Sequence, residues 1–220
     1  MREARSYSAA ALNDRYGWVI SGGYGGIGKS KLSSVEHTSD GRNFETLPSM
    51  PIPLVSHCLV SLDGDEDGDL FVTGGYADSD PNKRAFLFKN GSWKEMESMP
   101  TARQSLMCGP VRSQPGGPVE KIVVTGGYKD GRLATVEVYN VKENSWETAD
   151  DLPFGPLFGA AVIPFEDTFI MIGGYGSNGY SDKLWKYKKS GEWEEMPKKL
   201  NEGKVRATAI AVPSNIFPSC

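Results

Sequence analysis

The stretch of this sequence with the most recognisable chemistry runs from Gly23 to Ser30 and reads GYGGIGKS. It matches the pattern of Gly, four residues and Gly-Lys-Ser in which backbone N–H groups and a lysine cradle nucleotide phosphates. That chemistry needs a helix beginning at the Lys-Ser pair, because the helix N-terminus offers positive charge to the phosphates. The residues after Ser30 are instead rich in Ser and Thr and end in an Asp-Gly turn, which is typical of a strand. We therefore expect no nucleotide site, and Lys29→Ala and Ser30→Ala should leave the protein close to wild type.

Two further motifs have simpler explanations than the chemistry they suggest. The stretch from Asp63 to Gly68 resembles the start of a calcium-binding EF-hand loop, with carboxylates at positions 1, 3 and 5 and glycine at position 6. Position 12, which should be a bidentate Glu, is Gly74, and strands rather than helices are expected on both sides. We interpret this stretch as a solvated loop. The NGS tripeptide at residues 90–92 matches a glycosylation acceptor, but Asn-Gly is also a favoured hairpin turn, and the turn explains it.

The histidines and cysteines do not indicate metal or nucleophilic chemistry. The chain has two histidines, His37 and His57, expected on different strands, and three cysteines, Cys58, Cys108 and Cys220. The cysteines are odd in number and lack metal-ligand spacing, so we expect Cys58 and Cys108 to be small buried hydrophobes in neighbouring strands, not a disulfide. No Ser-His-Asp or Cys-His grouping is indicated. We expect no catalytic residues, no metal and no cofactor.

The chain is organised as a fourfold repeat. Four apolar segments end in Gly-Gly, and the first glycines of the pairs are 52, 52 and 47 residues apart, so the phosphate-loop match is one copy of a repeat. An aromatic residue follows 19 to 22 residues after each first glycine, with one apolar run between them and another beyond. Each period therefore predicts four short strands, a to d, in a meander. The residues expected to be structural are Gly22, Gly23, Gly74, Gly75, Gly126, Gly127, Gly173, Gly174, Phe44, Trp93, Trp146 and Trp193.

The double glycine closing strand b, the aromatic residue in strand c (Phe88, Tyr139, Tyr187) and the Trp opening strand d together resemble a kelch repeat, four times over. Repeat 1 departs from the pattern, with His37 in strand c and Phe44 in place of Trp. The resemblance implies an all-β fold, a β-propeller in which each repeat is a four-stranded blade. The large aromatics should then fill the wedges between blades. We expect one domain over residues 1–220, with repeats at about 5–50, 51–101, 102–154 and 155–200.

Both ends suggest that this propeller is incomplete. Residues 204–212 have the pattern of another strand a, an orphan strand without b, c or d, and residues 213–220 form a tail. Residues 1–6 align with the internal linker 99–104, so Met1 stands where a linker methionine is expected. A six-bladed parent fits both ends. The alternative is a closed four-bladed ring with a spare strand. An open arc would expose strand edges and blade faces, and we expect it to self-associate through them.

Composition excludes several classes of partner. The net charge is −4, and Lys and Arg are scattered rather than clustered, so no nucleic-acid partner is expected. No apolar stretch reaches the roughly 18 residues of a bilayer span, and the N-terminus lacks the apolar core of a signal peptide. We expect no membrane association, and a cytoplasmic location if the N-terminus is genuine.

The remaining prediction is a non-enzymatic interaction module. The resemblance implies binding of an unknown protein partner through loops on one face, as in kelch propellers that serve as ubiquitin-ligase substrate receptors or bind actin; the N-terminal BTB domain of the ligase adaptors is not seen here. In a meander the b–c and d–a loops emerge together, so they should carry the site. The residues predicted to bind are Tyr24, Tyr76, Tyr128, Tyr175, Tyr180, Arg5 and Arg103.

One test and two alternatives accompany this prediction. The post-glycine tyrosines could instead pack against neighbouring blades. Charge reversal at Arg103 together with Tyr180→Ala is expected to abolish partner capture without changing the melting temperature. The alternative function is the propeller domain of an enzyme resembling galactose oxidase, or a carbohydrate-binding protein; the oxidases need two histidines and two tyrosines on one metal, a set not seen here.

Overall fold

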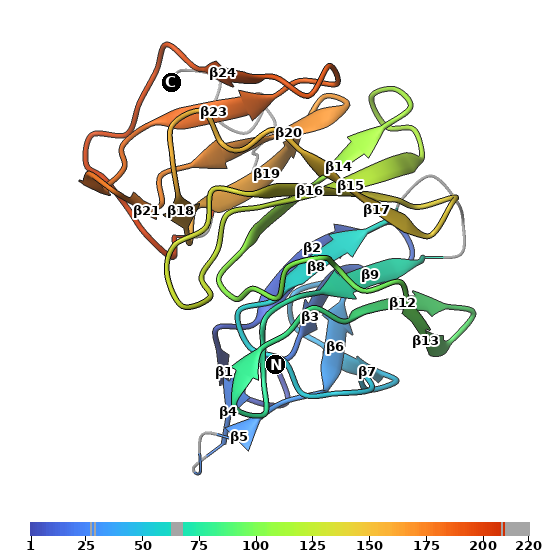
Figure 1. Ribbon diagram of the computed structural model, residues 1–220. Coiled ribbons are helices and arrows are strands. Elements are labelled where there is room, and N and C mark those ends of the chain that lie inside the picture. Colours follow the sequence, from blue (N-terminus) through green and yellow to red (C-terminus); the bar gives the residue numbers. More distant parts are fainter. Residues whose placement is uncertain (27, 29, 63–67, 208, 210–220) are drawn as a thin grey trace, which may run out of the picture.

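The computed structural model describes residues 1–26, 28, 30–62, 68–207 and 209. The regular elements in this part of the chain are all β-strands, and most belong to four four-stranded antiparallel sheets that fan out in chain order (Figure 1). The prediction of four blades, each with strands a to d, is confirmed. Blade 1 consists of β2 (Ala9–Asn13), β3 (Gly17–Ser21), β6 (Val35–Thr38) and β7 (Glu45–Leu47), and blade 2 of β8 (Cys58–Ser61), β9 (Leu70–Thr73), β12 (Ala85–Lys89) and β13 (Ser92–Met96). Blade 3 consists of β14 (Met107–Arg112), β15 (Val119–Thr125), β16 (Val136–Asn140) and β17 (Ser145–Ala149), and blade 4 of β19 (Ala161–Phe165), β20 (Thr168–Ile172), β23 (Leu184–Tyr187) and β24 (Trp193–Glu195).

Short strands join the d–a and b–c loops at one end of the blades. These strands are β1 (Arg5–Ser6), β4 (Tyr24–Gly25), β5 (Ser30–Lys31), β10 (Tyr76–Ala77), β11 (Asp80–Pro81), β18 (Leu157–Phe158), β21 (Tyr175–Gly176) and β22 (Gly179–Tyr180). In every blade the tyrosine after Gly-Gly pairs with the d–a segment of its own repeat: Ser6 with Tyr24, Val55 with Tyr76, Gln104 with Tyr128 and Phe158 with Tyr175. The b–c and d–a loops therefore share one face, as predicted.

The Gly-Gly pairs are required because d–a segments close on them from two sides. A Cβ on Gly126 would lie 2.2 Å from the carbonyl oxygen of Leu157, in the next blade's d–a segment. A Cβ on Gly127 would lie 2.8 Å from the carbonyl oxygen of Gln104, in the d–a segment of its own repeat. Both glycines also have positive φ, 58° and 96°, which side chains rarely adopt. The glycines thus permit the contact that joins one blade to the next.

Aromatic side chains fill the spaces between blades, as the repeat pattern predicts. Phe71 of blade 2 stacks on Tyr139 of blade 3 with ring centroids 4.6 Å apart, within an apolar core shared by these two blades. Trp93 and Trp146 each donate an indole hydrogen bond of 2.8 Å to a carbonyl at the end of the preceding blade, that of Pro48 and that of Glu97 respectively. In blades 2 and 3, the Trp at the start of strand d therefore ties its blade to the preceding one as well as filling volume.

A chain of backbone hydrogen bonds links the blades at the start of their innermost strands. Ser56 N–H donates to the carbonyl of Tyr7 (2.9 Å), Ser105 to Ser56 (3.0 Å), Gly159 to Ser105 (3.0 Å) and Arg206 to Gly159 (2.7 Å). All five residues have φ between 50° and 66°. We call this series the backbone belt; it holds the d–a corners at fixed spacing around the central axis.

The C-terminal segment extends the belt by one position. Gly174 N–H donates to the carbonyl of Lys204 (2.7 Å), just as Gly75 N–H donates to that of Arg103 (2.9 Å). Residues 204–207 therefore dock on blade 4 like the d–a segment of a further repeat. They form no strand, and the rest of the predicted orphan strand, except residue 209, lies outside the described residues together with the tail 213–220.

Blade 1 exposes apolar side chains on the face that turns away from blade 2. Leu12 and Trp18 are directly paired across β2 and β3 and are 56% and 40% exposed. Self-association through an open propeller edge stays a prediction, and these are the residues that it would involve.

Candidate functional site

Four aromatic rings gather where the loops of blades 3 and 4 meet. Tyr128 and Phe158 are 6.2 Å apart between ring centroids, Phe158 and Tyr175 5.7 Å, and Tyr175 and Tyr180 5.1 Å. Tyr128 is 42% exposed and Tyr180 66%. We call these four residues the aromatic cluster. Phe158, Tyr175 and Tyr180 also line a hollow of about 280 Å³, together with Val205 and Arg206.

Cationic side chains flank the aromatic cluster. The Arg132 guanidinium lies 5.4 Å from the centroid of the Tyr175 ring, and the Arg206 guanidinium 5.2 Å from that of Tyr7. Lys129 is exposed beside them, and Asp130 is the acidic residue in the same loop. Lys129, Arg132 and Arg206 thus form a cationic rim beside the cluster, although the chain as a whole has a net charge of −4.

The rings of the other two predicted tyrosines, Tyr24 and Tyr76, are in contact with side chains of the same chain. Tyr24 is half-buried against Tyr7, with ring centroids 6.3 Å apart. Tyr76 is half-buried, holds the Lys31 ammonium 4.3 Å from its ring centroid, and donates its hydroxyl to the carbonyl of Ser79 (2.8 Å). Of the five predicted tyrosines, only the three in blades 3 and 4 come together.

The prediction that Arg103 contacts a partner is wrong, because its side chain is fully buried. Its guanidinium donates to the carbonyls of Gly126 (2.9 Å) and Thr135 (3.0 Å) and lies 2.7 Å from a carboxylate oxygen of Glu137, itself buried in strand c of the same blade. Burial lowers the pKa of Arg103, and the Glu137 charge opposes that shift. Arg103 therefore holds a d–a segment against its blade, and reversing its charge would destabilise the fold.

Arg5 has the same structural role in blade 1, so its assignment to the binding face is also wrong. Its side chain is 1% exposed, donates to the carbonyls of Gly22 and Ser34, and lies 2.5 Å from a Glu36 oxygen. Burial alone would raise the pKa of Glu36, but hydrogen bonds from the Arg2 backbone and from Arg5 outweigh it, and the pKa is lowered.

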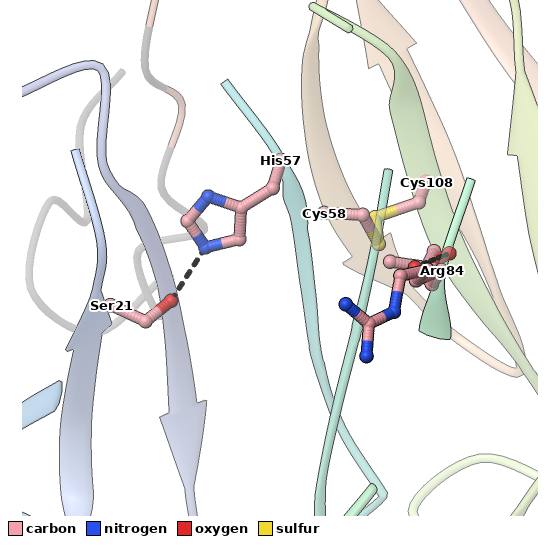
Figure 2. Close-up of a disulfide and its surroundings, with 6 residues drawn as sticks. Ser21, His57, Cys58, Arg84 and Cys108 are labelled. Carbon is pink, nitrogen blue, oxygen red and sulfur yellow. Dashed lines mark hydrogen bonds between the residues drawn. A yellow bond between two sulfur atoms is a disulfide. The ribbon is translucent and has the colours of Figure 1, made fainter. Parts of the chain in front are cut away.

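His57 is buried at the central end of blade 2. Its Nε2 lies 2.7 Å from the Ser21 hydroxyl oxygen of blade 1 (Figure 2). Desolvation by burial lowers the pKa of His57 to about 3, so the ring is neutral at physiological pH. It lines a cavity of about 510 Å³ at the inner end of the d–a loops. His37 lies on β6 and contacts Tyr16 with ring centroids 5.3 Å apart, which is a packing role.

The interpretation of Cys58 and Cys108 as unlinked buried hydrophobes is wrong. The two residues form a disulfide between β8 and β14, the first strands of blades 2 and 3, with Cα atoms 6.0 Å apart (Figure 2). They were correctly expected on neighbouring strands, but sequence spacing does not show that two such side chains face each other. Cys220 lies outside the described residues.

The structure describes part of the phosphate-loop motif and the glycosylation motif. Gly25 pairs with Ser30 in an antiparallel hairpin, so the phosphate-loop pattern is a b–c loop; Lys29 lies outside the described residues, as do Asp63 and the four residues after it. Asn90 and Gly91 have φ of 52° and 76°, which fits the predicted hairpin turn. In the described part of the chain, no three His, Cys, Asp or Glu side chains come together as metal ligands, and no helix has the length and apolarity of a bilayer span.

Three residues of the site were missed in the sequence. Phe158 stands where the other repeats have Ser6, Val55 and Gln104, so an aromatic residue in that d–a position was a usable signal. The sequence carries no comparable signal for Arg132 and Arg206, because their proximity to the tyrosines depends on how blade 4 and the C-terminal segment pack.

Comparisons with known proteins agree with this architecture. A family model described as the Kelch motif matches residues 120–153. The chain is 27% identical over 160 residues to spermatocyte protein spe-26 of Caenorhabditis elegans, a match that spans 69% of this chain and 27% of that protein. It is 26% identical over 213 residues to Kelch-like protein 40 of Xenopus tropicalis, spanning 87% of this chain and 33% of that protein. The chain thus spans about a third or less of these curated relatives. The solved structure titled "Structure of YjhT" matches with a TM-score of 0.70 at 17% identity, over 93% of this chain and 73% of that one, which shows a likeness of fold alone.

Four meander sheets joined through Gly-Gly turns define a β-propeller, and the Kelch motif model matches the third of its repeats. The chain is a kelch-repeat β-propeller protein. That its parent has six blades stays a prediction.

Proposed function

We propose that this chain is a non-enzymatic protein-interaction module that binds its partner through the b–c and d–a loops of blades 3 and 4. The observation that carries the proposal is the aromatic cluster, in which Tyr128 and Tyr180 remain exposed beside Arg132 and Arg206. Tyr and Arg are enriched among the residues that dominate binding energy at protein interfaces. A Tyr ring offers a large apolar area together with a hydroxyl that can hydrogen-bond, so it tolerates water before binding and burial after it.

The backbone under the cluster is fixed, which favours binding. Tyr128 and Gln104 exchange two backbone hydrogen bonds of 2.8 and 3.1 Å, and Tyr175 pairs with Tyr180 across β21 and β22. Less conformational entropy is lost when a partner docks on side chains whose backbone is already ordered. The cationic rim of Lys129, Arg132 and Arg206 favours a partner segment that carries carboxylates around an apolar anchor, with the anchor in the hollow beside Tyr180.

Site-specific photo-crosslinking tests the location of the face. A photoreactive phenylalanine analogue replaces Tyr180 in one variant and Phe165 in a matched control, because Phe165 is also exposed (37%) but lies at the a–b turn of blade 4, on the opposite face. We expect a discrete adduct from position 180, with a protein identified by mass spectrometry, and none from position 165. Equal adducts from both positions, or an adduct from 165 alone, would contradict the proposal.

A further inference from the structure

The disulfide lies directly beneath the backbone belt. Cys58 follows Ser56 by two residues and Cys108 follows Ser105 by three, and these two serines share the belt hydrogen bond of 3.0 Å between blades 2 and 3. Gln104, the residue before Ser105, pairs with Tyr128 of the aromatic cluster. The covalent link between the blades is thus only a few backbone positions from the proposed binding face.

The two halves of the disulfide differ in accessibility. Cys58 is 2% exposed and belongs to the apolar core shared by blades 2 and 3. Cys108 is partly exposed and lines a central cavity of about 370 Å³ between the innermost strands. A thiol reductant entering from the centre of the propeller therefore meets the Cys108 side of the bond first.

We propose that the Cys58–Cys108 disulfide is a redox-controlled brace that fixes the b–c and d–a loops of blade 3 in their binding geometry. In the reducing step, one thiolate of a dithiol reductant attacks the Cys108 sulfur and the S–S bond breaks. Cys58 leaves as a thiolate and takes up a proton. The second thiol of the reductant then displaces Cys108, which leaves two protein thiols and an oxidised, cyclic reductant. The protein gains two electrons and two protons from the dithiol.

The reduced protein should remain folded but lose stiffness at one place. Non-covalent contacts between blades 2 and 3 persist, among them the Phe71 and Tyr139 stack and the Trp146 bond to the carbonyl of Glu97. The entropy that a cross-link removes from the unfolded chain returns on reduction, and the sequence separation here is 50 residues. We expect the melting temperature to fall by roughly 8 to 16 °C on reduction.

The test uses the full chain in a Cys220→Ser background, which leaves the disulfide pair as its only cysteines, compared with a variant that also carries Cys58→Ala and Cys108→Ala. Hydrogen exchange is measured at the amides of Ser105 and Tyr128, with Gly174 of blade 4 as an internal control, before and after dithiothreitol. We expect reduction to speed exchange at Ser105 and Tyr128 by about tenfold or more and to leave Gly174 unchanged. The double alanine variant should show the exchange rates of the reduced protein, and dithiothreitol should not change them.

Unchanged exchange at Ser105 and Tyr128 after complete reduction, verified by thiol titration, would overturn the brace, as would an equal change at Gly174. Since the inference rests on the proposed function, a second measurement follows the yield of the crosslinked adduct from position 180. If dithiothreitol lowers the yield of the adduct in the Cys220→Ser chain but not in the double alanine variant, redox control of binding is supported. If reduction speeds hydrogen exchange but leaves the adduct yield unchanged, redox control of binding is overturned. If the oxidised chain gives no adduct at all, the proposed function is refuted instead.

Discussion

Replacing the buried Arg103 and Glu137 pair by apolar residues tests whether it is the interaction that holds a d–a segment to its blade. The repeats supply the replacement: at the equivalent positions blade 2 has Leu54 and Phe86. The variants are Arg103→Leu, Glu137→Phe and the two combined. In the single Arg103→Leu variant, the carboxylate of Glu137, which is 2% exposed, loses its cationic partner.

The expected energies differ strongly between single and double variants. Removing one partner of a buried ion pair costs about 3–5 kcal/mol, because the remaining charge is buried without compensation. Replacing both by apolar side chains of suitable size is often close to neutral, so the double variant should lie within about 2 kcal/mol of wild type. The coupling energy between the two sites is then about 4 kcal/mol or more.

Equilibrium unfolding in urea measures these values, with the m-value as a check that unfolding remains two-state. The matched control is the exposed pair of Lys121 and Glu147 in the same blade, whose side chains are 44% and 62% exposed. Lys121→Leu should change the free energy of unfolding by less than about 1 kcal/mol. A cost below about 1 kcal/mol for Arg103→Leu, or additive single costs in the double variant, would refute the structural role of the pair.

Two further predictions concern the buried His57 and the Gly-Gly turn. The pKa of His57 is about 3 in the folded protein and about 6.5 in the unfolded chain, so its stabilising contribution is complete above pH 6.5 and is lost as the pH falls towards 3. We expect the free energy of unfolding to fall by about 2 kcal/mol between pH 7 and pH 5. In a pH series of urea melts, His57→Gln should abolish this loss. An equally steep loss in the variant would assign that pH dependence to other groups. Gly127→Ala should destabilise the protein by about 2 kcal/mol or more, because the φ of 96° and the Gln104 carbonyl oxygen 2.8 Å away leave no room for a Cβ. The control is Gly131→Ala in the same loop, where a Cβ meets nothing within 4 Å, and it should cost less than about 0.5 kcal/mol. Similar costs for both variants would contradict the account of the turn.

The sequence predicted the blades because their determinants recur. Gly126 and Gly127 have counterparts at the same place in each repeat, and so does Trp146, apart from Phe44 in the first. Each copy solves the same steric problem, so the period and the order of strands could be inferred without coordinates. The common face of the b–c and d–a loops followed from the alternation of connections in a meander.

The burial of Arg103 and the disulfide were not predicted, for different reasons. An arginine in a loop is usually exposed, and the partner of Arg103 lies 34 residues further on; the signal that was available is that Arg and Glu occur together in repeats 1 and 3 and are replaced together by apolar residues in repeats 2 and 4. The cysteines follow Ser56 and Ser105 by different numbers of residues, so the repeat pattern does not align them. Only the geometry of two adjacent innermost strands brings their sulfurs together.

The central claim, that blades 3 and 4 bind a protein through the aromatic cluster, is tested most directly by the affinity of two matched variants for the purified partner that the crosslink identifies. Tyr180→Ala and Phe165→Ala each remove one exposed aromatic side chain, the first on the proposed face and the second on the opposite face. Titration calorimetry should show Tyr180→Ala weakening binding by about 30-fold, the equivalent of about 2 kcal/mol, with unfolding curves unchanged, and Phe165→Ala binding like wild type. Equal affinities for wild type and Tyr180→Ala, or a loss confined to Phe165→Ala, would contradict the claim.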